Sequence, residues 1–255
     1  MFRNTAHEHG VGVEKHFRWR AGEITRLEGF SDAVFAFALT LLVVSLEVPH
    51  TFDELMDTMR GFVAFGVCFA ILVQVWFYHY RYFRRYGLQD GVTVVLNAGL
   101  LFVVLFYVYP LKFLFTTLVG SITGGATVGG RTALDAMLGP QDVPMLMTIY
   151  GLGFAAVFGI LALLYGNAYR KRGELELDPH ETLLTQHSLF ENVGVGCIGL
   201  FSALLAHLLP VGRSGLAGFA YFLIPAYATA CGTYFGRRAK ELDRSAHKHD
   251  HASSL

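Results

Sequence analysis

Residues 26–49 read RLEGFSDAVFAFALTLLVVSLEVP, an apolar run with a carboxylate, Asp32, near its start. A helix that crosses a bilayer needs about 20 mostly apolar residues, because about 30 Å of hydrocarbon is crossed at about 1.5 Å per residue. Such a run inside lipid can only be helical, because a lone strand would leave its backbone hydrogen-bonding groups without partners. The stretch therefore predicts a membrane-spanning helix with a charged group close to one end.

Five further apolar runs follow this one along the chain. Of the 255 residues, 53% are hydrophobic and 16% are charged, whereas soluble domains carry roughly 25% charged residues. We therefore expect an all-α, polytopic membrane protein with six transmembrane helices, surrounded by a lipid bilayer and without a nucleic-acid partner. The expected spans are residues 29–48, 60–80, 91–112, 144–166, 190–209 and 215–236.

Basic residues separate between the two sides of these spans. Sixteen of the 20 Lys and Arg residues lie within residues 3–26, 81–85, 170–172 and 237–248, which an even number of spans places on one side. The positive-inside rule makes that side cytoplasmic, together with both termini. The chain then divides into a cytoplasmic segment 1–25, a transmembrane domain 26–238 and a polar cytoplasmic tail 239–255, for which no stable structure is expected. The Gly-rich loop 113–143 should face outward.

An unpaired carboxylate at Asp32 would be costly in the membrane, by about 2.5–3.5 kcal/mol at the centre of a span and less near its end. Partners therefore have to come from other helices. Trp76 and His79 lie at matching depth at the cytoplasmic end of the second span, and Asn97 lies in the third. We expect Ser31 and Asp32 to bond to some of these residues and to fix the first span against the next two.

The opposite side of the first span carries a continuous apolar stripe. At about 100° per residue its members fall within about 40° of one line, whereas Asp32 points about 200° away from Phe30. Such a stripe is typical of ordinary helix packing and is also compatible with the lining of a pore, and the pattern alone leaves both interpretations open. The stripe consists of Phe30, Val34, Phe37, Leu41, Val44 and Val48.

Several residues of the first three spans match the signature of a known family. They are Arg26-x3-Phe30-Ser31-Asp32, Thr40-Leu41-Leu42 and Pro49 in and after the first span, Trp76-x2-His79 closing the second, and Asp90 and Asn97 at the third. On these residues the chain resembles the transmembrane protein 175 family, the potassium channels of endosomes and lysosomes and their prokaryotic relatives. The resemblance is specific over residues 24–110 and rests on the number of spans elsewhere.

This resemblance implies a single-repeat prokaryotic member, a homotetramer in the cell membrane. It implies a potassium-preferring cation channel that needs no cofactor, passes K⁺ and lines its pore with the first helix. Carried over by position, the hydrophobic constriction and threonine layer are Phe37, Thr40, Leu41 and Val44. The structural polar network is Arg26, Phe30, Ser31, Asp32, Trp76, His79 and Asn97. Relatives usually have Ile or Leu at the position of Phe37, so the resemblance implies either a tighter plug there or a narrowest point at Leu41.

A secondary transporter, proton-coupled or cation-coupled, is the alternative function, with Asp32 and His79 titrating during its cycle. Transporters tend to carry internal repeats and broken helices, and the two halves of this sequence look dissimilar. The sequence carries no HExxH, GxSxG or phosphate-binding loop, which are motifs of catalytic and metal sites. We therefore expect neither an enzyme nor a metal centre.

Overall fold

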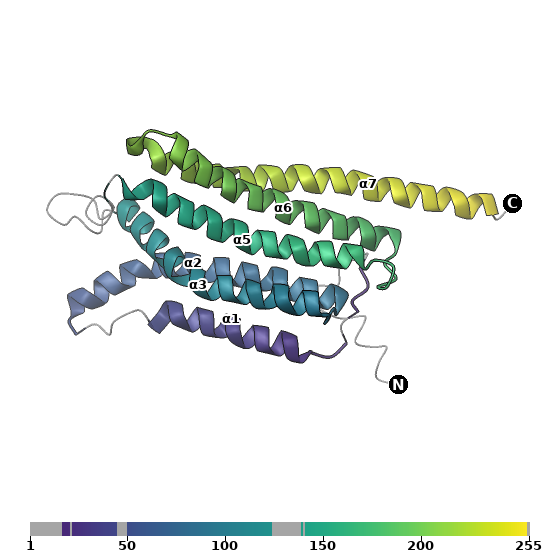
Figure 1. Cartoon of the computed structure of the whole chain (residues 1–255), viewed down its shortest axis with the longest axis horizontal. Helices are drawn as coiled ribbons and strands as arrows, with labels where there is room; N and C mark the ends of the chain where they lie inside the picture. The colour runs from purple at the N-terminus through teal and green to yellow at the C-terminus, as the bar shows by residue number, and fades with distance from the viewer. Residues whose placement is uncertain (1–16, 21, 45–49, 124–138, 140, 254–255) are drawn as a thin grey trace.

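The computed structural model describes residues 17–20, 22–44, 50–123, 139 and 141–253. Within these residues the chain forms six α-helices, one 3-10 helix and no strand, which confirms the all-α class. Figure 1 shows the α-helices side by side in an elongated bundle. The elements are α1 (Arg26–Val44), α2 (Phe52–Tyr86), α3 (Gly91–Thr123), α5 (Asp142–Arg170), α6 (Pro179–Leu208), the 3-10 helix η1 (Val211–Phe222) and α7 (Leu223–Ser253).

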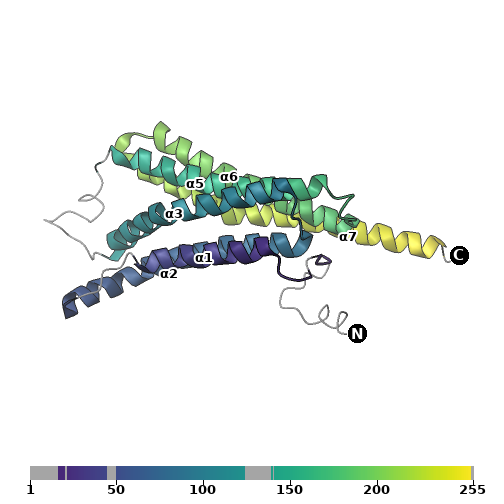
Figure 2. The same ribbon diagram turned by 60° about the horizontal axis from the view of Figure 1, so that its bottom comes forward.

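In the described part of the chain, five segments are long and apolar enough to cross a bilayer. Four of them lie in α2, α3, α5 and α6, and the fifth, Arg213–Ser245, joins η1 to α7. The remaining helix, α1, has 19 described residues. It packs along α2 and α3, which separate it from α5, α6 and α7 (Figure 2). The fold is that of a polytopic membrane protein, with α1 as the sixth helix of its bundle.

Successive helices run in alternating directions. The start of α1, the ends of α2 and α5 and the end of α7 all lie at one end of the bundle (Figure 1). The basic clusters 81–85 and 170–172 close α2 and α5 at this end, and cluster 237–248 runs from the middle of α7 toward it. The alternation that the Lys and Arg distribution requires is therefore present. This basic end is the one that the positive-inside rule assigns to the cytoplasm.

α6 begins at Pro179, well before the start expected at residue 190. Asp178 caps the helix by accepting a hydrogen bond from Glu181 N at 2.8 Å, while Glu181 Oε2 accepts one from Asp178 N at 3.1 Å. This capping box, with proline in the first turn, starts a helix in a polar sequence that hydropathy alone excludes from the span.

α7 continues to Ser253, so the expectation of a tail without stable structure from residue 239 is wrong. The tail begins with Ala239, Lys240, Glu241 and Leu242, which are strong helix formers. Leu242 packs against the cluster of Leu183, Cys231 and Phe235. Asp243 Oδ1 lies 3.1 Å from His180 Nε2 of α6. Propensity and tertiary contacts together carry the helix past the end of the bundle (Figure 1).

The main hydrophobic core joins α1, α2, α3 and α5. Its fully buried side chains include Leu42, Tyr82, Phe83, Leu100, Leu161 and Tyr165. Beside this core, α5 and α6 approach so closely that a Cβ atom added at Gly151 would lie 2.5 Å from Gly199 O. Small residues at a crossing allow two membrane helices to touch through their backbones. α5 packs in turn against α3 and α2, the two helices against which α1 lies.

Candidate functional site

α1 starts with a capping box. Glu28 N donates to Thr25 Oγ1 at 3.1 Å, and Thr25 N donates to Glu28 Oε2 at 2.9 Å. The Glu28 side chain is buried, and its Oε1 lies 3.9 Å from Arg84 Nε of α2. These contacts satisfy N–H groups of the first turn and hold the start of α1 against the basic end of α2. Glu28 is not among the site residues expected from the sequence, although its spacing from Thr25 is the signature of such a cap.

Five polar residues join α1 to α2 and α3, and we name them the polar clamp: Ser31, Asp32, Trp76, His79 and Asn97. Trp76 Nε1 donates to Asp32 Oδ1 at 2.8 Å. Asn97 Nδ2 donates to Ser31 Oγ at 2.9 Å, and His79 Nε2 lies 2.8 Å from Asn97 Oδ1. The structure therefore brings together these five residues of the expected polar network, from three different helices.

Three residues of the polar clamp form a chain in which each side chain donates a hydrogen bond to the next, from His79 through Asn97 to Ser31. Ser31 Oγ donates to Leu27 O at 2.8 Å and so accepts from Asn97 Nδ2. The Asn97 oxygen can only accept, so His79 Nε2 donates the proton that lies between them. Within the described residues, His79 Nδ1 has no hydrogen-bond partner. A neutral His79 in this site therefore carries its proton on Nε2.

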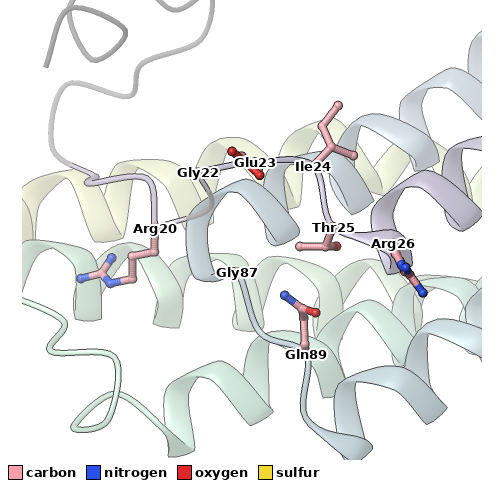
Figure 3. Close-up of a pocket in the computed structure, with 8 residues that line it drawn as sticks. All are labelled: Arg20, Gly22, Glu23, Ile24, Thr25, Arg26, Gly87 and Gln89. Atoms are coloured by element: carbon pink, nitrogen blue, oxygen red, sulfur yellow. The ribbon is translucent and has the colours of Figure 1, made fainter. Parts of the chain in front are cut away.

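Two residues of the expected network, Arg26 and Phe30, lie outside the polar clamp in this chain. Phe30 is 61% exposed. Arg26 is exposed beside a pocket of about 460 Å³ at the start of α1. Figure 3 shows this pocket between the loop of residues 22–25 and the turn that carries Gly87 and Gln89.

The exposed face of α1 is turned away from the centre of the apolar stripe. Phe37 is 57% exposed and Thr40 is also exposed, whereas Leu41 is half-buried against the core. At about 100° per residue, the exposed arc runs from Asp32 to Phe30 and is centred near Thr40, about 80° from the centre of the stripe. Contacts with α2 and α3 thus bury part of the stripe and bring a threonine to the middle of the free face.

Thr40 presents a hydroxyl oxygen to this face. Its Oγ1 donates to Phe37 O at 2.7 Å, so the hydroxyl proton is used within the helix. The lone pairs of the oxygen remain available, and oxygen lone pairs are what replaces the water around a permeating K⁺ ion. The side chain of Val44, the fourth residue expected at the constriction, lies outside the described residues.

Residues 17–20, which we name the strap, fasten the approach to α1 onto α6. Arg20 Nη2 lies 2.6 Å from Glu181 Oε2, and the two side chains are 12% and 2% exposed. Arg18 N also donates to Glu181 Oε1, at 2.8 Å, and Phe17 is buried. Figure 3 shows Arg20 directed away from Thr25 and the rest of the pocket. The strap was not expected from the sequence, because it has neither an apolar run nor a helical period.

Comparison with known proteins assigns the family. The sequence profile of the family described as endosomal/lysosomal potassium channel TMEM175 matches residues 26–107, which contain α1, α2 and the whole polar clamp. A protein of Marivirga tractuosa named "Potassium channel" is 38% identical over 237 residues, which cover 91% of this chain and 96% of that protein. The chain belongs to the TMEM175 family.

Solved structures of TMEM175 proteins agree with this assignment. A variant of the potassium channel MtTMEM175, crystallised with a nanobody–MBP fusion protein, is 39% identical, with a TM-score of 0.77 over 91% of this chain and 100% of that one. The crystal structure of a lysosomal potassium-selective channel TMEM175 homolog from Chamaesiphon minutus is 23% identical, with a TM-score of 0.51 over 81% of this chain and 96% of that one. The second likeness concerns the fold alone. The TMEM175 fold therefore extends well beyond the segment that the family profile matches.

Proposed function

We propose that this TMEM175 protein is a homotetrameric, potassium-preferring cation channel in the plasma membrane of a prokaryote, with α1 of each subunit beside a central pore. The exposed face of α1 carries the proposal, because Phe37 and Thr40 lie free on it while the polar clamp holds Asp32 at its edge. Relatives named as potassium channels match this chain over nearly its whole length and support the proposal. K⁺ is the permeant ion, and neither a catalytic step nor a cofactor is involved.

Assembly around an axis accounts for the residues on this face. In a membrane the face is covered either by lipid or by other copies of the chain. Lipid would leave the lone pairs of the Thr40 oxygen without a donor, whereas a ring of α1 helices directs Thr40 and Phe37 of every subunit toward a shared centre. Closed cyclic symmetry is the usual arrangement of homo-oligomers. The proposed number of four subunits rests on the family resemblance.

A ring of this composition selects among cations through the cost of removing their water. Phe37 rings from four subunits form an apolar constriction, and such constrictions gate by excluding water. K⁺ gives up water more readily than Na⁺, so a narrow apolar ring opposes Na⁺ more strongly. Oxygens of Thr40 replace part of the water that K⁺ loses. Because Leu41 is half-buried against the core, we propose that Phe37 forms the narrowest point.

Single-channel recording of the purified protein in planar bilayers tests this function. We expect unitary K⁺ currents, and a reversal potential with KCl on one side and NaCl on the other that reports a preference for K⁺. Phe37→Ala should move that reversal potential toward zero, and Thr40→Val, which removes the oxygen at nearly constant volume, should do the same. Phe102→Ala on α3 is the matched control, because Phe102 is 72% exposed, and it should leave the reversal potential unchanged. Unchanged selectivity in both α1 variants would refute the proposed pore lining.

The alternative function, a secondary transporter that uses Asp32 and His79, gives a different result in the same recording. A transporter shows a slow, saturable, proton-dependent flux without unitary currents. His79 is 1% exposed and bonds to Asn97, while Asp32 bonds to Trp76. A proton cycle would therefore have to break the polar clamp at two separate bonds. Flux that disappears in Asp32→Asn while no unitary current is seen in the parent protein would favour the transporter.

A further inference from the structure

An open groove of about 420 Å³ lies between α1 and α2. It is lined by Asp32, Phe35, Ala36, Leu39, Leu72, Val73 and Trp76. Apart from Asp32 and the indole N–H of Trp76, these side chains offer only carbon to an occupant. The groove thus combines one negative charge with long apolar walls, and we name it the Asp32 groove.

We propose that the Asp32 groove binds an organic monocation that has a primary ammonium head and a short alkyl tail. Asp32 is exposed, and among the described residues its hydrogen-bond partner is Trp76 Nε1, which bonds to Oδ1 at 2.8 Å. The second carboxylate oxygen is available to a ligand. A carboxylate within a span is costly without a counter-charge, and an ammonium group supplies both the charge and the hydrogen bond.

The same surroundings do not suit a metal ion. A cation such as Ca²⁺ takes about 6–8 oxygen ligands, and the walls of this groove offer the oxygens of one carboxylate. Across the described ranges of the chain, no three His, Cys, Asp or Glu side chains converge as metal ligands would. An ammonium group has three N–H donors; one can bond to the carboxylate while the others stay in water at the open side of the groove, and its alkyl tail gains from contact with the walls.

Trp76 strengthens the selection of a cation. Its indole stacks on Tyr80, with ring centroids 5.5 Å apart, so its orientation is fixed from one side. The face of a tryptophan ring attracts cations, and its apolar body gains from contact with an alkyl tail. A lipid chain would contact the apolar walls of the groove but leave Asp32 without a counter-charge. The charged head of an ammonium ligand therefore favours it over a lipid chain.

Tryptophan fluorescence measures this binding directly. The chain has two tryptophans, so Trp19→Phe leaves Trp76 as the reporter on the groove wall. We expect n-hexylammonium to change the Trp76 emission of the purified full-length protein in a saturable manner. The uncharged probe 1-hexanol has the same tail but lacks the charged hydrogen bond, and its affinity should be about tenfold lower.

Three variants in the Trp19→Phe background locate the site. Asp32→Asn keeps an acceptor for Trp76 Nε1 and removes the charge, so it should weaken n-hexylammonium about tenfold and leave 1-hexanol unchanged. Ala36→Phe fills the groove from an exposed position and should abolish binding of both probes, which keeps the test valid where Asp32→Asn does not fold. Glu23→Gln removes an acidic side chain outside the groove and should leave both affinities unchanged.

Equal affinities for the two probes, or an unchanged affinity in both Asp32→Asn and Ala36→Phe, would overturn the proposal. Absence of saturable binding to the parent protein would also overturn it, because lipid or a second copy of the chain would then occupy the groove. The measurement involves no ion flux. Its failure is therefore distinct from failure of the proposed channel function.

Discussion

Replacing Asn97 by alanine breaks the polar clamp at its centre. Asn97 is 1% exposed and bonds on both sides, to His79 Nε2 at 2.8 Å and to Ser31 Oγ at 2.9 Å. Its removal leaves the Nε2–H group of His79 without an acceptor, and the other ring nitrogen already has no partner within the described residues. Ser31 keeps its bond to Leu27 O and loses only an incoming one. The loss at His79 therefore dominates the expected effect.

The size of the effect follows from burial. Hydrogen bonds between membrane helices average about 0.6 kcal/mol and reach about 1.7 kcal/mol, whereas stranding a buried donor costs about 1–3 kcal/mol. The second range applies to His79, because the residue is 1% exposed and its ring does not reach water. With the weaker Ser31 bond added, Asn97→Ala should lower the free energy of unfolding by about 2–4 kcal/mol.

Asn192 supplies the matched control. It is also buried, at 5% exposure, but its side chain bonds to Ser188 O of its own helix at 2.7 Å. Asn192→Ala should therefore cost less than about 1 kcal/mol. Equilibrium unfolding of the purified protein in mixed micelles with increasing SDS, followed by helicity, measures both variants. If Asn97→Ala is no more destabilised than Asn192→Ala, the polar clamp does not hold α1.

Three further substitutions test other parts of the structure. Gly151→Ala should lower the unfolding free energy by about 1–3 kcal/mol, because the new Cβ would lie 2.5 Å from Gly199 O; thermal unfolding followed by helicity measures it. Burial opposes the ionisation of Asp90, but hydrogen bonds from Thr93 and Asn167 and the charge of Lys171 outweigh it and hold the pKa of Asp90 below its usual range. The ionised Asp90 carboxylate therefore stabilises the folded state fully above its unfolded pKa of about 3.9, and this stabilisation is lost as the pH falls through the lower folded pKa. The difference in unfolding free energy between the parent protein and Asp90→Asn should shrink on acidification across that window. Glu181→Gln should release the strap and speed tryptic cleavage after Arg18 and Arg20 about tenfold, as a mass-spectrometric time course would record.

Each of these predictions has its own control. At Gly66 an added Cβ meets nothing within 4 Å, so Gly66→Ala should not destabilise α2, and equal losses at the two glycines would contradict the close crossing of α5 and α6. For Asp90, a stability difference that stays constant through the acid range would contradict the lowered pKa. Glu174, whose side chain is 76% exposed, is the control for the strap, and Glu174→Gln should leave the tryptic cleavage rate unchanged.

Hydropathy predicts where the helices of this protein lie, because crossing a bilayer fixes their length and composition. It also narrows the partners of Asp32, since few side chains at its depth can accompany a carboxylate, and Trp76 is the residue that bonds to it. The rotation of α1 is harder to predict. A sequence pattern does not tell which apolar residues of a helix are buried by its neighbours. In this structure the positions of α2 and α3 leave Leu41 half-buried and Phe37 exposed.

The strap and the start of α6 were missed for a different physical reason. Both depend on the single carboxylate of Glu181, which accepts hydrogen bonds from Arg18 and Arg20, more than 160 positions earlier in the chain, and from Asp178. No local period or composition marks such a contact. The length of α7 was missed because Leu242 and Asp243 pack against α6 only once the bundle has formed.

Backbone contact at Gly151 and Gly199 makes α5 and α6 a rigid pair. Sliding one helix along the other would drive a carbonyl oxygen into the opposing main chain, and closely packed elements resist such displacements. α1 is attached differently, through side chains that change rotamer at much lower cost. A displacement of α1 against α2 and α3 therefore meets less resistance than a displacement of α5 against α6.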